Sequence, residues 1–499
     1  MTTKELQHMD VVIGIDASTT GTKAVAFGPD GTVHALTRAA IDRHSPEPTW
    51  HEQDAEEWWS STLDVLIGAA GELTAGGHTV RAIGITHQRE SFVCLDGQMR
   101  PLRPAMLWLD ARAGAQVERL GDGTAHRISG KPPSTTPSFY KLGWLADHEP
   151  QTLAAAQHVA DVHAFLSHRL TGNLATSTAS ADPMGLVDMA SNDWSEELLT
   201  RVGLRREQMP ALVPPGGMVG HVTAQVAQLT GLPEGLPVVA GAGDGQSGGL
   251  GAGVSRKGLA YLSLGTSITL GVHAAEGADA SWDYRLLGSP LGEGVTIEGF
   301  INSGALSVAW FRKAFAGAIP EDPAGLEDLL DSTAPGAGGL RYLPYLSGSA
   351  TPFWDDQARG TFAGFTESHG AGEFYRAVLE GLAFETKVLL DRLEVPAGRV
   401  EEIVVLGGGS ASRAWIEILA SVLNRPLAIS STTEATALGA AILAASAVGL
   451  VPGGIAAAAE AMVSVERRVQ PTPELVAVYA PAAQSYAQLY PALKEWFRS

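Results

Sequence analysis

One pattern occurs twice in the chain: a short apolar strand, a turn of small polar residues and a second apolar strand. It occurs first at residues 11–27, where the turn reads Asp-Ala-Ser-Thr-Thr-Gly, and again at residues 259–272, where the turn reads Gly-Thr-Ser. Apolar, β-branched runs on either side of turn residues are typical of hairpins. The two hairpins begin about half a chain apart, which favours a duplicated core. Short Gly/Thr turns also recur by chance, so the pattern alone leaves duplication open.

The segments between and after the hairpins alternate between helical and strand-like patterns. Residues 55–70 carry apolar side chains at helical spacing, and residues 80–85 form a short apolar run. Alternating strands and helices indicate an α/β fold. A chain of 499 residues is long enough for two or three domains. We expect a break near residues 253–257, which predicts domains at 9–253 and 254–499.

Charge and cysteine content exclude several classes of protein. The formal net charge is −20 at pH 7. Binding to nucleic acid or to anionic membrane needs clustered Lys and Arg, so neither partner is expected. An anionic cofactor would depend on backbone N–H groups, a metal ion and a few placed cations. The single cysteine, Cys94, excludes an internal disulfide framework and a zinc site built from several cysteines.

No segment has the pattern of a leader or a membrane span. The first ten residues lack the apolar core of a signal peptide. Residues 435–451 form the most apolar long stretch, but Ala and Gly dominate it and Pro452 follows, which predicts a buried helix. We therefore expect a cytoplasmic protein.

Three glycine-rich segments favour a nucleotide site, but not of two common kinds. The chain has no G-x-x-x-x-G-K-[ST] sequence, which excludes a P-loop. Residues 243–248 match G-x-G-x-x-G, yet no acidic residue follows at the roughly 20-residue spacing of a dinucleotide site. What remains is phosphate held by two hairpins that face each other across a cleft. Residues 407–410 end a strand before a helix, where bare backbone suits phosphate or a purine; a plain loop is the alternative.

Asp16 ends the first strand, and Thr19, Thr20 and Lys23 follow it closely. A carboxylate in this place suits a hydrated Mg²⁺ that bridges phosphate oxygens. The alternative is an Asp that closes the turn with its own backbone. The hydroxyls and the ammonium group that follow favour the metal role. Thr266 in the second hairpin has a similar choice between donating to phosphate and closing its own turn.

Two further segments carry polar side chains at strand ends. Asp244 follows the apolar run 237–240 between two glycines, where it can accept a proton from a hydroxyl during phosphoryl transfer. A plain Asp-Gly turn is the alternative. The run 88–90, Gln-Arg-Glu, also follows a strand and offers donors and acceptors to a polyhydroxylated ligand, or else an exposed ion pair. Trp108 is either an apolar wall against a sugar or a core residue.

Five blocks of the chain, in order, resemble the FGGY family of carbohydrate kinases. The blocks are 138–148, 344–360, 360–385, 405–426 and 434–445. The resemblance implies an α/β kinase of two actin-like ATPase (ribonuclease H-like) domains, with ATP and sugar meeting in a central cleft.

The resemblance also implies roles for individual residues. Asp244 is expected to be the catalytic base, and Asp16 is expected to hold Mg²⁺. The residues expected to contact ATP are Thr19, Thr20, Lys23, Gly265, Thr266, Gly408, Gly409 and Ser412. The residues expected to contact the sugar are Gln88, Arg89, Glu90, Trp108 and Gln246.

The residues expected to contact the substrate resemble those of more than one related kinase. Arg89, Glu90 and Trp108 are similar to the polyol contacts of glycerol kinases, but Thr136 stands where those enzymes have an aromatic residue, and Gln246 follows a glycine rather than a second glutamine. The overall spacing and the Ala-rich C-terminal segment resemble xylulokinases. Autoinducer-2 kinases share the Arg-Glu pair.

The sequence therefore predicts an ATP-dependent kinase for a primary hydroxyl of a small ketose or polyol, with a pentulose expected first. The alternatives are a glycerol, tetritol or autoinducer-2-type acceptor, or a non-enzymatic actin-like protein that binds sugar and nucleotide. The expected partners are ATP, Mg²⁺ and the small-molecule acceptor, and a homodimer is the assembly to be tested.

Overall fold

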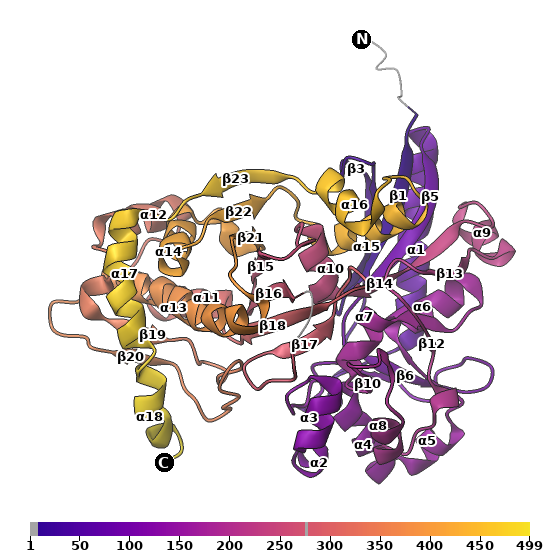
Figure 1. The fold of residues 1–499 in the computed structure, drawn as a ribbon, viewed down its shortest axis with the longest axis horizontal. Helices are drawn as coiled ribbons and strands as arrows, with labels where there is room; N and C mark the ends of the chain where they lie inside the picture. Colours follow the sequence, from indigo (N-terminus) through magenta and orange to yellow (C-terminus); the bar gives the residue numbers. More distant parts are fainter. Residues whose placement is uncertain (1–7, 275–277) are drawn as a thin grey trace.

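The structure is a computed structural model that describes residues 8–274 and 278–499. We call the described residues before and after the expected boundary, 8–253 and 254–499, the first half and the second half. Each half is built around one large sheet, and the halves lie side by side with helices α10 and α15 between them (Figure 1).

The first sheet has six strands. In spatial order they are β13 (Met218–His221), β14 (Pro237–Gly243), β5 (Thr79–His87), β1 (Asp10–Ala17), β2 (Gly21–Phe27) and β3 (Val33–Ala40). The second sheet has seven strands. In spatial order they are β17 (Arg285–Gly288), β18 (Val295–Ile301), β16 (Ile268–Ala274), β15 (Leu259–Leu264), β21 (Glu402–Leu406), β22 (Leu427–Ser430) and β23 (Val465–Val469).

The two sheets repeat one topology. In the first, β14, β5 and β1 are parallel, and β13, β2 and β3 each pair antiparallel with their neighbours. In the second, β22, β21 and β15 are parallel, and β23, β16 and β18 pair antiparallel. The predicted hairpins are β1–β2 and β15–β16, in corresponding positions. The repeated hairpin in the sequence thus reflects a repeated sheet.

Helices cover the sheets and connect their strands. Those of the first half are α1 (Ala55–Ala75), α2 (Gly114–Leu120), α3 (Gly123–Ser129), α4 (Ser138–His148), α5 (Pro150–Ala155), α6 (Val162–Thr171), α7 (Thr178–Ala181), α8 (Glu196–Arg201), α9 (Ala224–Thr230) and α10 (Asp244–Gly251). Those of the second half are α11 (Ala305–Ala314), α12 (Pro323–Ser332), α13 (Ala371–Ala397), α14 (Arg413–Leu423), α15 (Ala435–Ala447), α16 (Gly454–Met462), α17 (Pro473–Tyr486) and α18 (Leu489–Phe497). Among the described residues, no helix is both long and apolar enough to cross a membrane.

Shorter strands form four small sheets. The largest joins β4 (Glu52–Gln53), β7 (Ala105–Met106), β6 (Phe92–Leu95) and β8 (His158–Asp161). The three pairs are β9 (Ala175–Ser177) with β12 (Ala211–Val213), β10 (Val187–Asp188) with β11 (Asp193–Trp194), and β19 (Arg341–Leu343) with β20 (Thr361–Ala363).

Helix α15 belongs to the second half of the chain but packs on the first sheet. Glycines of the strands and alanines of the helix let the two approach closely. The buried helix expected at 435–451 is present and ends at Ala447. A Cβ added at Gly14 of β1 would lie 2.0 Å from the carbonyl oxygen of Ala437, and one at Gly84 of β5 would lie 2.1 Å from that of Ala440. The halves are therefore interlocked, and the boundary at residue 253 remains a prediction.

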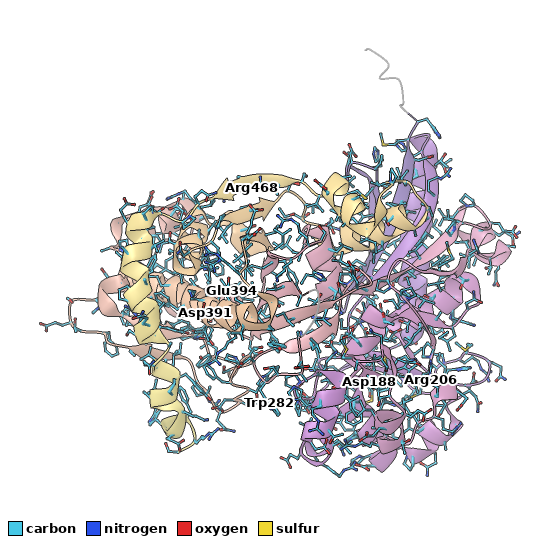
Figure 2. The ribbon with its side chains drawn as sticks, viewed as in Figure 1. Asp188, Arg206, Trp282, Asp391, Glu394 and Arg468 are labelled. Carbon is cyan, nitrogen blue, oxygen red and sulfur yellow. The ribbon has the colours of Figure 1, made fainter. Side chains whose placement is uncertain are left out.

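The two halves also touch at their lower edge. There the indole of Trp282 in the second half packs edge-on against the ring of His126 in α3, with ring centroids 4.7 Å apart (Figure 2). Nearby, the buried ammonium group of Lys131 donates to Asp182 in its own half and to the carbonyl of Leu286 in the other, both at 2.6 Å. These contacts fix the second sheet beside the first.

Candidate active site

The polar side chains singled out in the sequence lie at one edge of the first sheet. Strands β1, β5 and β14 are parallel neighbours, with Asp16 beside Thr86 and Gly243 beside His87. Asp16 is the last residue but one of β1, the run 88–90 follows β5 and Asp244 follows β14. Because carboxyl ends of parallel strands share an edge, three segments far apart in the sequence converge here.

Asp16 is a buried carboxylate with an unused acceptor. It is 8% exposed, and its Oδ1 accepts no hydrogen bond from any group in the described part of the chain. Burial, and then the nearby charges of Asp244 and Glu434, raise its pKa from 3.8 to about 7, although Lys23 acts in the opposite direction. A cation beside this oxygen would restore the charged form.

The donor set fits a hydrated Mg²⁺. Within residues 8–274 and 278–499, no three His, Cys, Asp or Glu side chains come together in a group that could hold a metal ion. Mg²⁺ keeps several waters and is often bound by one or two carboxylates together with substrate phosphates. Asp16, with its free oxygen and the carboxylate of Asp244 nearby, matches that mode better than a closed protein cage.

Asp244 begins helix α10, so the alternative of a plain Asp-Gly turn is wrong. Its Oδ1 accepts the backbone N–H of Gly245 at 2.8 Å and pairs with Nε of Arg89 at 3.0 Å. No group in the described residues donates to its Oδ2, and the side chain is 41% exposed. The residue thus has one oxygen fixed and the other open.

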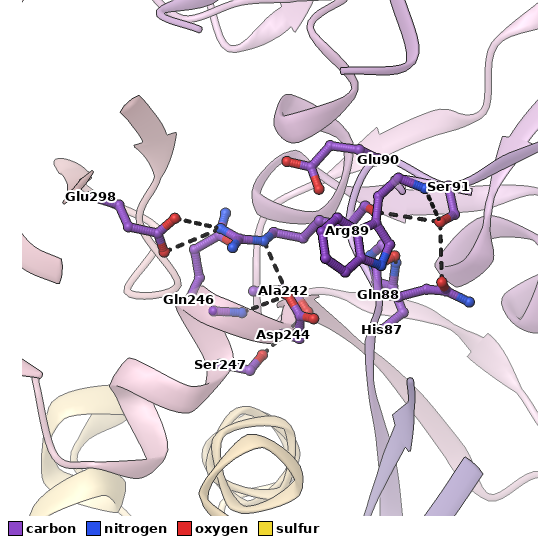
Figure 3. A network of polar contacts seen from close by, with 12 residues as sticks. His87, Gln88, Arg89, Glu90, Ser91, Ala242, Asp244, Gln246, Ser247 and Glu298 are labelled. Atoms are coloured by element: carbon purple, nitrogen blue, oxygen red, sulfur yellow. Dashed lines mark hydrogen bonds and ion pairs between the residues drawn. The ribbon is translucent and has the colours of Figure 1, made fainter. Parts of the chain in front are cut away.

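Arg89 and Glu90 are not an exposed ion pair; each pairs with a residue of the second half. Nη1 of Arg89 donates to both oxygens of Glu298 on β18, at 3.2 and 3.3 Å (Figure 3). Glu90 pairs with Nη1 of Arg285 at 3.4 Å, and Arg285 also pairs with Glu298. The hydroxyl of Tyr261 donates to Glu298 at 2.7 Å. The pairs cross from one half to the other.

Sequence reasoning missed the partners in the second half. Glu298 had one local signal, since it is the single charge in the apolar strand Val295–Ile301. Arg285 and Tyr261 had none, because their roles depend on how the two sheets face each other.

Trp108 and Gln88 are linked through the first hairpin. The indole N–H of Trp108 donates to Oγ1 of Thr19 at 2.9 Å, and that hydroxyl donates to Oε1 of Gln88 at 3.0 Å. Trp108 is 38% exposed, so the alternative of a core residue is wrong. Its indole remains available to a ligand.

Gln246 lies behind the sheet edge rather than in front of it. It is 1% exposed, and its amide donates to the carbonyl of Ala179 at 2.9 Å and to Asp182 at 3.3 Å. These contacts engage the side chain in the protein's own structure. Its expected contact with a sugar is therefore the least supported of the predicted sugar contacts.

The hairpin residues divide into free and engaged groups. Thr20 and Thr266 are exposed at the tips of the two hairpins, while Gly265 donates its N–H to the carbonyl of Ser267 at 3.1 Å. The ammonium group of Lys23 pairs at 2.7 Å with Glu434, a partner that the sequence did not indicate. Lys23 is thus held beside Asp16, at the edge where phosphate is expected.

A cavity of about 570 Å³ lies against the glycine-rich loop of the second half. It is lined by Ala305, Val308, Ala309, Arg312, Pro323, Ala324, Leu326, Glu327, Tyr375, Leu379, Gly408, Gly409, Ala411, Ser412 and Trp415. A Cβ added at Gly408 would meet nothing within 4 Å, so this part of the loop is open. The lining is mostly apolar, which suits a flat aromatic ring.

Ser412 has a structural role in this loop. Its hydroxyl accepts the N–H of Trp415 as the N-cap of α14 and donates to Glu327 at 2.7 Å. It therefore shapes the cavity wall, and a direct contact with adenosine would require it to exchange a partner.

Comparison with known proteins covers nearly the whole chain. The N-terminal domain model of the FGGY family of carbohydrate kinases matches residues 11–251, and the C-terminal domain model matches residues 260–448. The chain is 34% identical to a xylulose kinase of Klebsiella pneumoniae, over 97% of this chain and 99% of that protein. It is 31% identical to a glycerol kinase of Janthinobacterium sp. (strain Marseille), over 88% of this chain and 90% of that protein. The crystal structure of a xylulose kinase from Rhodospirillum rubrum superposes with a TM-score of 0.91 at 29% identity, over 98% of this chain and 100% of that one.

Proposed function

The chain belongs to the FGGY family of carbohydrate kinases, and we propose that it transfers the γ-phosphoryl group of ATP to a primary hydroxyl of a pentulose. The observation that carries the proposal is the shared sheet edge, where Asp16 has an unused oxygen and Asp244 has an open one. A metal-binding acid and a proton acceptor side by side are the parts that phosphoryl transfer to an alcohol requires.

Asp244 acts as the general base in this mechanism. Its Oδ1 is fixed by Gly245 and Arg89, so Oδ2 faces the acceptor. As the hydroxyl oxygen bonds to the γ-phosphorus, the bond between that phosphorus and the ADP oxygen breaks, and the hydroxyl proton moves to Oδ2.

The other residues of the edge bind and orient the triphosphate. Asp16 would hold Mg²⁺, which supplies positive charge to the phosphate oxygens when bound. The hydroxyls of Thr20 and Thr266, exposed at the two hairpin tips, donate to phosphate from opposite sides. The apolar cavity beside Gly408 receives the adenine.

A cavity at Thr136 supports a pentulose over glycerol. Thr136, where glycerol kinases have an aromatic residue, lines a cavity of about 490 Å³ between the halves together with Phe300, Asn302 and Trp354. Polar groups and an aromatic wall suit the additional carbons and hydroxyls of a five-carbon sugar. Relatives whose name is xylulose kinase match along 96–97% of the chain.

A shorter polyol is the second candidate. The pair Arg89-Glu90 and the open face of Trp108 favour it, since the family resemblance associates these residues with polyol contacts.

A substrate panel tests the proposal. ADP release is measured with D-xylulose, L-xylulose, D-ribulose, erythritol and glycerol at equal concentrations. We expect kcat/KM for one pentulose to exceed that for glycerol and erythritol by at least about 100-fold, because the site's buried polar groups would stay unpaired with a shorter acceptor. The highest kcat/KM on glycerol or erythritol would favour the second candidate, and no turnover on any acceptor would contradict the kinase assignment.

A further inference from the structure

A chain of charges connects the open carboxylate of Asp244 to the second sheet. Asp244 pairs with Nε of Arg89 at 3.0 Å, and Nη1 of Arg89 donates to Glu298 at 3.2 and 3.3 Å. Figure 3 shows the guanidinium lying between the two carboxylates. Arg89 and Glu298 are 209 positions apart in the sequence and lie in different halves.

Glu298 is a buried carboxylate whose surroundings stabilise its charged form. Its side chain is 0% exposed. Burial alone raises the pKa of a carboxyl group, but the guanidinium groups of Arg89 and Arg285 lower the pKa of Glu298 to about 2. The hydroxyl of Tyr261 donates to it as well. A buried carboxylate with three donors is rigid, and so is the arginine that it holds.

The shape of the guanidinium explains why the orientation of Arg89 matters for Asp244. An arginine beside a single carboxylate tends to pair with both of its oxygens at once. In this site Nη1 of Arg89 donates to both oxygens of Glu298, which holds the guanidinium in an orientation in which Nε contacts Asp244. Its second oxygen is left free.

From this geometry we propose that Glu298 is a positioning residue for the transfer reaction. It keeps Arg89 turned so that Asp244 is anchored by one oxygen and presents the other to the acceptor hydroxyl. The inference rests on the proposed role of Asp244 as base. It also makes the geometry of the base in the first half depend on the second half.

The direct test replaces Glu298 by glutamine, which keeps the size and removes the charge. With Glu298→Gln, Nη1 of Arg89 loses its charged partner, so the guanidinium can turn and pair with both oxygens of Asp244. We expect kcat to fall by about 10- to 100-fold, the range that misplacement of a reacting group produces. The dissociation constant for ATP, measured by calorimetry, is expected to stay within about twofold, because Glu298 does not touch the nucleotide cavity.

A double-mutant cycle with Arg89→Lys separates positioning from folding. Lysine has no planar fork, so it cannot connect two carboxylates in the same way. If Glu298 acts through Arg89, adding Glu298→Gln to Arg89→Lys lowers kcat by less than about twofold. Losses that multiply in the double variant would overturn the inference.

Two further variants keep the test decisive if Glu298→Gln folds poorly. Glu298→Gln with Arg285→Gln removes both members of one ion pair, and the same loss of kcat is expected. Because Arg285 also pairs with Glu90, KM for the acceptor is measured beside kcat to separate a binding defect from the positioning defect. The control is Glu385→Gln, which changes a buried carboxylate that accepts from Tyr345 and Tyr486 and lies outside the proposed site. It should lower the melting temperature without changing kcat of the folded protein.

The outcomes distinguish this inference from the proposed function. A kcat for Glu298→Gln within twofold of the natural protein would overturn the positioning role and leave Asp244 as base. Full turnover in Asp244→Asn would instead contradict the proposed base itself.

Discussion

At the scale of single residues, the site contains two buried carboxyl groups whose pKa values are shifted in opposite directions by their surroundings. Asp16 is buried with a free oxygen and an elevated pKa, whereas Glu298 is buried with three donors and a depressed one. The first arrangement is costly until a cation arrives, and the second is satisfied by the protein itself. This contrast favours Asp16 as a residue that binds a cation and Glu298 as a residue that holds other side chains in place.

Asp16→Asn should stabilise the ligand-free protein in a pH-dependent way. Because the pKa of Asp16 rises from 3.8 to about 7 on folding, the folded state binds a proton that the unfolded state has lost, and stability falls as pH rises through this window. The gain from Asp16→Asn should therefore be negligible near pH 4, grow up to about pH 7 and stay constant above it. Melting temperatures between pH 4 and 8 measure this gain.

The same variant should lose its advantage when ligand is present. With Mg²⁺ and ATP added, the natural protein is expected to gain melting temperature and Asp16→Asn to gain little, since the cation loses its protein carboxylate. A pH-independent difference without ligand, or equal stabilisation by Mg²⁺ and ATP, would contradict the role given to Asp16.

At the scale of elements, α15 can lie close to the first sheet because the strand residues that face it are glycines. Gly14 and Gly84 face the backbone of α15 at distances that no Cβ tolerates. Because both contacts are with backbone rather than with the end of a flexible side chain, the helix itself must move to admit a methyl group.

Gly14→Ala should destabilise the fold strongly. The added Cβ meets the carbonyl of Ala437 at 2.0 Å, and overpacking of this kind costs about 3 kcal/mol. The matched control is Gly71→Ala in α1, where a Cβ meets nothing within 4 Å and should stabilise the helix by about 0.5–1 kcal/mol. Urea unfolding of both variants measures the two changes, and a Gly14→Ala variant as stable as the natural protein would contradict the packing described.

Elements formed by one continuous stretch of the chain were predictable from the sequence. The hairpins at 11–27 and 259–272 and the strand end before Asp244 are confirmed, because strand and turn residues leave a local pattern. The buried helix expected at 435–451 is confirmed but ends at Ala447, and the first strand extends past Asp16 to Ala17. Roles of the site residues stay predictions.

Contacts between distant elements were not predictable. Lys23 reaches Glu434, which is 411 positions away, and Arg89 reaches Glu298, so no local pattern records either pair. Ser412 was expected at adenosine, yet its hydroxyl caps α14, a role that depends on the exact start of the helix. These pairings follow from the way the two sheets face each other.

At the scale of the whole molecule, the two halves are interlocked by exchange of structure. Helix α15 packs with the first sheet, where Val12, Val25 and Val239 share a core with Leu438 and Ile442. The ion pairs of Arg89 with Glu298 and of Glu90 with Arg285 connect the halves at the site. Each half also has a large apolar cluster of its own, but the cluster on this face of the first sheet is completed only by α15 and α16.

A fragment of residues 1–253 should therefore not fold alone. Without α15, the face of the first sheet that includes Val12 and Val239 is exposed, and an exposed apolar face of this kind favours aggregation. Expressed alone, the fragment should bind an apolar dye and lack a cooperative melting transition. Co-expression with 254–499 should abolish the dye binding and restore the cooperative transition. A cooperative transition in the isolated fragment would contradict the interlocked core.

The most direct test of the account is the sugar-dependent ADP release of Asp244→Asn, measured beside its nucleotide affinity. The amide keeps the size and the anchored oxygen of Asp244 but cannot take the hydroxyl proton. The account predicts a loss of kcat of about 10²–10⁴-fold with ADP affinity nearly unchanged, since a general base contributes in that range. Turnover above a tenth of the natural rate would contradict it.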